Sequence, residues 1–216
     1  MGKMEIVYVW DAYCGWCYGF DPVLLKFLEK HPDLEVSTVS GGLFTGESIS
    51  LVGDLGFIKK ANESITQLLG ARFGDPYNRL LDIGDQVLNS DYPAAVYAIY
   101  RPYLTGIKEI SFIYDVQKSF FQKGHSLSHI ATYMEVAKKY KLDDVISEEK
   151  LIKIIDSDAQ AQAYAQVDYK RARELKVKGF PSILIRYNDE IYDLRKNAIT
   201  VDQLEKNFQA IAKILK

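Results

Sequence analysis

Cysteine is scarce in this chain of 216 residues, where only Cys14 and Cys17 occur. Two cysteines cannot build the disulfide scaffold of a small secreted protein. Basic residues number 27 against 29 acidic ones, which gives a net charge of −2, and no dense basic run is present. This balance excludes nucleic acid as an expected partner. No stretch approaches the roughly 20 apolar residues of a membrane-spanning helix, so we expect no membrane contact.

The N-terminus also lacks the pattern of a secretory signal. Residues 1–5 lead directly into a β-type run at Ile6, without a charged segment, an apolar segment and a cleavage site in that order. Together with the scarcity of cysteine, this predicts a cytoplasmic protein. In that compartment a close cysteine pair is more often catalytic or metal-binding than structural.

The two ends of the chain have α/β patterns. Residues 6–10 are β-branched and aromatic, as in a buried strand, and a helix and a second strand at 34–39 complete a βαβ unit. Near the other end, a capping box at 157–160 predicts the start of a helix. Two paired strands and a terminal helix, which a second capping box opens at Thr200, follow it.

The middle of the chain has a helical pattern. Helices are predicted at 54–70, 91–104, 108–123, 128–140 and 147–156. The whole order is βαβ, a helical block, then αββα, and the flanks together have the thioredoxin order. We therefore predict an α/β protein with a thioredoxin-like domain, made of 1–44 and 158–216. A helical insertion domain at 45–157 interrupts it.

The cysteine pair lies where the first strand passes into a helix, in the run Cys14-Gly15-Trp16-Cys17. A helix start offers free N–H groups and a partial positive charge, which stabilise the thiolate that attacks disulfides. Cys14 is first and should cap the helix with its sulfur outward, so we predict that it is the nucleophile. Cys17 lies one turn further in and should resolve the mixed disulfide. Gly15 and Trp16 should tune the thiols and contact the substrate.

A metal site is the other chemistry that cysteine pairs support. His125 and His129 would complete a two-Cys, two-His set with ligand spacing within each pair. Residues 18–124, which are 107 in number, separate the two pairs, against about 12–20 in a local zinc finger. We therefore expect no metal.

Four motifs carry a family resemblance over most of the chain. They are Asp11-x-x-Cys14-x-Trp16-Cys17-Tyr18, Gly41-Gly42-Leu43-Phe44, Phe120-Phe121-x-x-Gly124 and Ala172-Arg173-x-Leu175-x-Val177-x-Gly179-Phe180-Pro181. With these motifs the chain resembles the DsbA family of thiol-disulfide oxidoreductases, especially its cytoplasmic FrnE-like and predicted disulfide-isomerase branch. The resemblance implies a thioredoxin-like fold with a large helical insertion and thiol-disulfide exchange without a bound cofactor. The implied partners are protein or small-molecule thiols and disulfides, with recycling by a cellular thiol system.

The resemblance also implies roles for residues outside the cysteine motif. Pro181 would be cis and lie against the active-site cysteines, and Phe180 would offer backbone groups to an extended substrate. From the sequence alone, Pro181 could also be a strand-start proline at a sheet edge. Asp11 is either the proton acceptor for Cys17 or a cap of the first helix. The family's periplasmic oxidant has a buried acid six residues before its first cysteine, where this chain has Tyr8.

Two other functions remain open. Glutathione-dependent isomerases and kappa-class transferases have the same fold and insertion, but they carry serine at the position of Cys14. Some relatives resemble non-catalytic protease adaptors whose cysteines are a redox switch. The direction of exchange is also open, although a reducing cytosol favours reductase or isomerase work. The tyrosines at 92, 97, 100 and 103 form a stripe that belongs either to the core or to a substrate groove.

Overall fold

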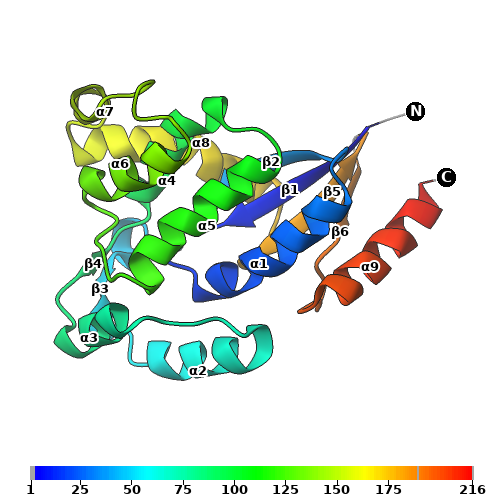
Figure 1. The fold of residues 1–216 in the computed structure, drawn as a ribbon, viewed down its shortest axis with the longest axis horizontal. Coiled ribbons are helices and arrows are strands. Elements are labelled where there is room, and N and C mark those ends of the chain that lie inside the picture. The colour runs from blue at the N-terminus through cyan, green and yellow to red at the C-terminus, as the bar shows by residue number, and fades with distance from the viewer. Residues whose placement is uncertain (1–2, 189, 216) are drawn as a thin grey trace.

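A four-stranded sheet is built from the two ends of the chain (Figure 1). The computed structural model describes residues 3–188 and 190–215, so positions 1–2, 189 and 216 of the predicted thioredoxin-like segments lie outside the described residues. The strands are β1 (Met4–Trp10), β2 (Glu35–Ser40), β5 (Ser182–Tyr187) and β6 (Glu190–Asp193). The helices that flank the sheet are α1 (Gly15–Lys30), α8 (Asp158–Glu174) and α9 (Val201–Ile214).

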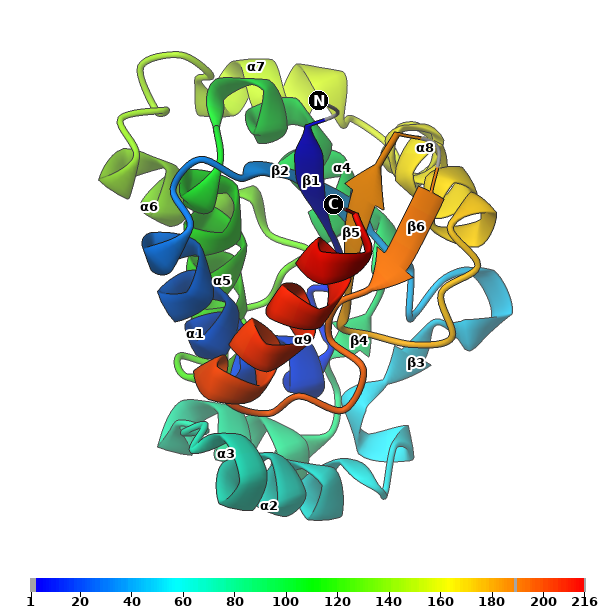
Figure 2. The same ribbon diagram turned by 90° about the vertical axis from the view of Figure 1, so that its right-hand side faces the viewer.

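The strand order is β2-β1-β5-β6, with β1 and β2 parallel and the other pairs antiparallel. β1 is central and buried on both faces. Val7 and Val9 pack with Ala172 of α8 on one face, while Tyr8 and Trp10 belong to the main core on the other. Figure 2 shows α1 and α8 on opposite sides of the sheet. This is the layered arrangement that the sequence pattern predicts.

The segment between β2 and α8 is largely helical. Its helices are α2 (Ile58–Leu69), α3 (Asp75–Ile83), α4 (Asp91–Tyr100), α5 (Ile107–Phe121), α6 (Ile130–Lys139) and α7 (Glu148–Ile154). A short antiparallel ribbon pairs β3 (Ser50–Leu51), near the start of the segment, with β4 (Val87–Leu88), between α3 and α4. α5 packs along α1, α4 packs along α8, and α2 and α3 form a layer beside the N-terminal end of α1 (Figure 1).

Two features of this segment differ from the sequence-based expectation. Helix α3 was not expected, because Gly74-Asp75-Pro76 has the composition of a helix breaker. In the structure Pro76 lies in the first turn of α3, where a missing N–H costs nothing. Tyr97 and Tyr100 of the tyrosine stripe do not line a groove, because both are fully buried. Tyr97 packs against Trp10, and Tyr100 packs against Phe112.

Polar groups that are buried or partly buried join the helical segment to the sheet. Arg101, directly after α4, donates to both carboxylate oxygens of Asp168 at 2.8 Å and to the carbonyl of Thr38 at 3.1 Å. Asp168 also accepts the N–H of Ser40 at 2.9 Å. Nearby, Thr38 donates to Glu109 at 2.8 Å. A buried carboxylate needs such partners, because an unpaired one would pay its full desolvation cost.

Two glycines allow α2 to approach α1 closely. A Cβ atom at Gly19 would lie 2.6 Å from Ile65 Cγ2 and 3.0 Å from Leu69 Cδ1. A Cβ atom at Gly15 would lie 3.0 Å from Ile65 Cδ1. The absence of side chains at both positions, four residues apart on one face, lets α2 cover the first turns of α1. Gly15 thus has a packing reason to stand between the cysteines.

We expect Gly19→Ala to destabilise the protein despite the better helix propensity of alanine. Overpacking costs about 1–3 kcal/mol and the propensity gain returns about 1 kcal/mol, so the net loss should be about 1–2 kcal/mol. Urea unfolding measures the difference. Gly56→Ala is the control, because a Cβ atom there meets nothing within 4 Å. A stability of Gly19→Ala equal to that of the control would contradict the close approach of the two helices.

Candidate active site

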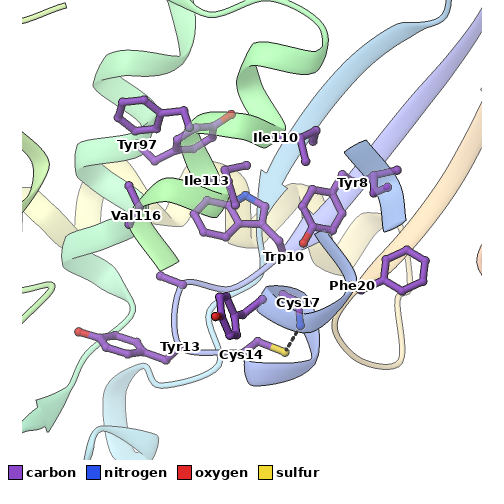
Figure 3. Packing of buried hydrophobic residues seen from close by; sticks show 14 of the residues in the cluster. Tyr8, Trp10, Tyr13, Cys14, Cys17, Phe20, Tyr97, Ile110, Ile113 and Val116 are labelled. Atoms are coloured by element: carbon purple, nitrogen blue, oxygen red, sulfur yellow. Dashed lines mark hydrogen bonds between the residues drawn. The ribbon is translucent and has the colours of Figure 1, made fainter. Parts of the chain in front are cut away.

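The cysteine pair lies at the N-terminal end of α1. Cys14 is the N-cap residue, and its Sγ accepts the N–H of Cys17 at 3.4 Å (Figure 3). Both cysteines are free thiols. Cys14 exposes 6% of its surface and Cys17 exposes none, so the first sulfur is recessed rather than fully outward. Of the two residues, only Cys14 has any contact with solvent.

Burial raises the pKa of the Cys17 thiol well above its ordinary value, and the neighbouring Cys14 raises it further. The cause is the loss of solvation for the charged form. Cys17 therefore rests as a neutral thiol, and it must lose a proton before it can act as a nucleophile.

The loop before β5 meets Cys14 from the other side. The Phe180–Pro181 peptide bond is cis, and Cys14 Sγ donates to the carbonyl of Phe180 at 3.5 Å. The Phe180 ring lies on Gly41, where a Cβ atom would be 2.2 Å from the ring. This explains the first glycine of the Gly41-Gly42 motif, whose second glycine has a positive φ of 74°.

Asp11 organises the loop that precedes α1. It is 2% exposed, and one carboxylate oxygen accepts the N–H of Tyr13 at 2.9 Å. The other oxygen accepts the N–H of Leu43 at 2.8 Å, and the Asp11 carbonyl accepts the side-chain amide of Gln117. Both oxygens are thus engaged by the backbone. Asp11 is not the cap of the first helix, because Cys14 is the N-cap residue of α1. Its contacts with Tyr13 and Leu43 instead hold the loop that precedes the helix.

A second buried acid was missed from the sequence. Asp21 of α1 is fully buried, and one of its oxygens accepts the hydroxyl of Tyr8 at 2.5 Å. Tyr8 comes from β1 and lies beside the first turns of α1 (Figure 3). The available signal was the spacing, because Asp21 follows Cys17 by four residues and therefore shares its face of the helix.

A hollow of about 120 Å³ opens beside Cys14 on the side of α2 and α5. Gly15, Trp16 and six further aromatic residues line it, namely Tyr13, Phe44, Phe57, Tyr77, Phe120 and Phe121. None of the described residues that line it is charged. Leu43 and Phe57 are exposed by 41% and 64%, so they offer apolar surface at its walls. The hollow is suited to an apolar group next to the reacting sulfur.

The Phe180–Pro181 loop borders a second hollow, of about 430 Å³. Its charged lining residues are Lys176, Lys178, Arg195 and Asp193. Arg195 donates to the carbonyl of Pro181 at 3.3 Å, and its guanidinium lies 5.0 Å from the centre of the Phe20 ring. Cys14 and the Phe180 carbonyl thus lie between an apolar hollow and one with an excess of positive charge.

The histidines are not part of this site. His125 and His129 border a shallow hollow between α5 and α6 with Glu135. Within residues 3–188 and 190–215, no three His, Cys, Asp or Glu side chains gather as a metal would require. In the same ranges, no helix combines the length and apolar character needed to cross a bilayer.

Comparison with solved structures identifies the fold. The chain matches the cytosolic disulfide reductase DsbM from Pseudomonas aeruginosa with a TM-score of 0.76 and 22% identity, over 97% of this chain and 99% of that one. A structure of that protein with GSH matches at 0.71 and 23%, over 97% and 99%. A candidate protein disulfide isomerase from Nitrosomonas europaea matches at 0.75 and 17%, over 98% of each chain. These matches confirm the predicted thioredoxin-like fold with a helical insertion.

More distant matches include a 2-hydroxychromene-2-carboxylate isomerase, with a TM-score of 0.60 and 16% identity over 98% of this chain and 96% of that one. No family model matches the sequence. No curated protein matches it either. At these identities the likeness concerns the fold, and the chemistry has to be argued from the site.

We expect Asp11→Asn to reduce stability, because the new amide N–H₂ would face a backbone N–H. Leaving a buried donor without an acceptor costs about 1–3 kcal/mol. Urea unfolding measures the loss, with the exposed Asp33→Asn as the control. Unchanged stability together with a shifted pH dependence of disulfide exchange would instead support Asp11 as a proton acceptor.

Proposed function

We propose that the protein is a thiol-disulfide oxidoreductase of the DsbA family that works as a disulfide reductase or isomerase. The observation that carries the proposal is the position of Cys14. It caps α1, three residues before a buried thiol, and its sulfur lies 3.5 Å from the Phe180 carbonyl next to a cis proline. The names of the similar structures, a cytosolic disulfide reductase and a candidate disulfide isomerase, support the same chemistry.

The reaction proceeds in two exchanges. The Cys14 thiolate attacks one sulfur of a substrate disulfide, so that a Cys14–substrate disulfide forms and the other substrate sulfur leaves as a thiolate. Cys17 then attacks Cys14 Sγ, which releases the second substrate thiolate and leaves the Cys14–Cys17 disulfide. Two electrons pass from the dithiol to the substrate. In the reverse direction the disulfide oxidises a substrate dithiol.

The remaining site residues position the substrate. The backbone of Phe180, held by Pro181 and by the contact of its ring with Gly41, pairs with the extended chain around the substrate sulfur. Gly15 and Trp16 line the apolar hollow and contact the group next to that sulfur. Asp11 keeps the loop before α1 in place through Tyr13 and Leu43. No bound cofactor or metal takes part.

We assign exchange to the thioredoxin-like domain, 1–44 and 158–216, and substrate choice to the insertion domain, 45–157. The apolar hollow is walled largely by the insertion, through Phe57 of the loop before α2, Tyr77 of α3 and Phe121 of α5. Aromatic walls accept apolar side chains of many kinds, which suits unfolded or extended polypeptide. The aromatic residues involved differ from Tyr97 and Tyr100, which are core residues.

Recycling would use a cellular thiol such as glutathione in the cytoplasm. The positive excess from Lys176, Lys178 and Arg195 beside the Phe180–Pro181 loop complements the carboxylates of an acidic thiol. The structure of DsbM with GSH supports this class of partner. The scarcity of cysteine and the name of that cytosolic protein support the compartment.

Two alternatives use the same fold. An isomerase like the 2-hydroxychromene-2-carboxylate enzyme remains an alternative, although the pair Cys14 and Cys17 speaks against it. A redox-switched adaptor would bind its partner through exposed apolar surface such as that at Phe57. Reduction of insulin disulfides with dithiothreitol separates the three, because only the oxidoreductase accelerates it.

We expect Cys14→Ser to abolish insulin reduction and Cys17→Ser to accumulate a mixed disulfide with the substrate. The reason is that only Cys14 has solvent contact, whereas Cys17 is fully buried. Non-reducing electrophoresis and intact-protein mass spectrometry detect the trapped species. Equal trapping by both variants would contradict the assignment of roles.

We also expect Phe57→Ala to slow reduction of a protein disulfide more than reduction of a small linear one such as 2-hydroxyethyl disulfide. Phe57 is 64% exposed, so its truncation removes binding surface at the apolar hollow with little effect on the core. Leu68→Ala is the control, because Leu68 is 52% exposed near the end of α2 and does not line the hollow. Equal effects on both substrates, or none, would exclude a role in substrate choice.

A further inference from the structure

The second exchange of the proposed reaction needs a group that accepts the proton of the Cys17 thiol. Cys17 is fully buried, burial raises its pKa, and it must become a thiolate to attack Cys14. Water cannot reach it freely, so a group inside the protein has to take the proton.

Asp21 is the carboxylate in position to do so. It follows Cys17 by four residues on α1, a spacing that puts side chains on one helix face with Cβ atoms about 5–6 Å apart. Both residues are 0% exposed. The charge of Asp21 acts on Cys17 and raises the pKa of its thiol, after burial and the neighbouring Cys14.

The two oxygens of Asp21 have different surroundings. Oδ1 accepts the Tyr8 hydroxyl. Oδ2 is buried and has no hydrogen-bond partner among the residues that the structure describes. A buried carboxylate oxygen without a donor is costly, so it calls for an explanation. By contrast, both oxygens of Asp11 are engaged by backbone N–H groups.

We infer that Asp21, oriented by Tyr8, accepts the proton of Cys17 when Cys17 attacks the Cys14–substrate disulfide, directly or across one water molecule. The inference rests on the proposed function. The Cys17 S–H bond breaks, the proton moves to the free Asp21 oxygen, the Cys17–Cys14 bond forms, and the substrate sulfur leaves with the electron pair of its bond to Cys14. When the disulfide is reduced again, Asp21 returns the proton to Cys17.

The surroundings of Asp21 match its basicity to this task. Burial raises the pKa of Asp21 well above its ordinary value, and the Tyr8 hydrogen bond lowers it again. Burial also raises the pKa of Tyr8, so Tyr8 stays a neutral donor. The titratable groups that face Asp21 are Tyr8 from β1, Cys17 from α1 and Tyr114 from α5. A stronger base than an ordinary carboxylate is better matched to a thiol.

Ellman's reagent separates the two exchanges in one stopped-flow trace. Reduced protein releases one coloured thiolate when Cys14 attacks the reagent, and a second when Cys17 resolves the adduct. In Asp21→Asn the first phase should be unchanged and the second slowed about 100-fold at neutral pH. The wild-type second phase should rise with pH and level off once Asp21 is ionised. In the variant it should keep rising with hydroxide concentration.

Tyr8→Phe tests the same point without removing the acid. Loss of the hydrogen bond raises the pKa of Asp21 further, so the levelling of the second phase should move to higher pH. Glu109→Gln is the matched control, because Glu109 is also a buried acid that accepts a tyrosine hydroxyl, that of Tyr97, but belongs to the network around Thr38. It should leave both phases and their pH dependence as in the wild type.

The outcomes are distinct. A second phase in Asp21→Asn with the wild-type rate and pH profile would overturn the inference. If circular dichroism shows that this variant does not fold, an unshifted profile in Tyr8→Phe would overturn it instead. A wild-type protein without two successive releases would contradict the proposed function itself.

Discussion

The burial of the first two turns of α1 is the constraint on which the rest of the site depends. α2 covers these turns because Gly15 and Gly19 have no side chains to hold it away. α5 holds the preceding loop through Gln117. Where these turns are excluded from water, a polar group needs an internal partner, and the Cys17 thiol loses the solvation that would ionise it. The chemistry of the cysteines follows from this enclosure.

The enclosure requires that the helical segment stay fixed to the sheet, and polar contacts between buried and partly buried side chains serve this purpose. Arg101 and Asp168 bind each other and the end of β2, so three segments distant in sequence meet at one ion pair. Thr38 and Tyr97 add a second connection through Glu109. Such contacts specify one arrangement because any displacement would leave a charge without a partner. Glu109 belongs to α5, which also supplies Phe120 and Phe121 to the wall of the apolar hollow.

Local patterns in the sequence predicted most of the fold. The strand at Ile6, the capping box at Ser157 and the cysteine motif each have a cause within a few residues, and the structure contains the elements they predict. Helix α3 was missed because Pro76 has opposite meanings in the first turn and in the interior of a helix. The burial of Tyr97 and the pairing of Tyr8 with Asp21 depend on contacts between distant segments. No local pattern encodes those contacts, although the spacing of Asp21 from Cys17 was visible.

The recessed position of Cys14 also affects whether two copies of the protein can form a disulfide with each other. A disulfide requires its two sulfur atoms to come within about 2.05 Å of each other. Two copies of this chain each present a sulfur below their own surface, so neither can enter the other, whereas a protruding substrate loop can enter either. With one cysteine pair and no other thiol, each copy that is not joined to a substrate is either the dithiol or the Cys14–Cys17 disulfide. The recess therefore disfavours exchange of electrons between copies of the protein and favours exchange with a substrate that can reach Cys14.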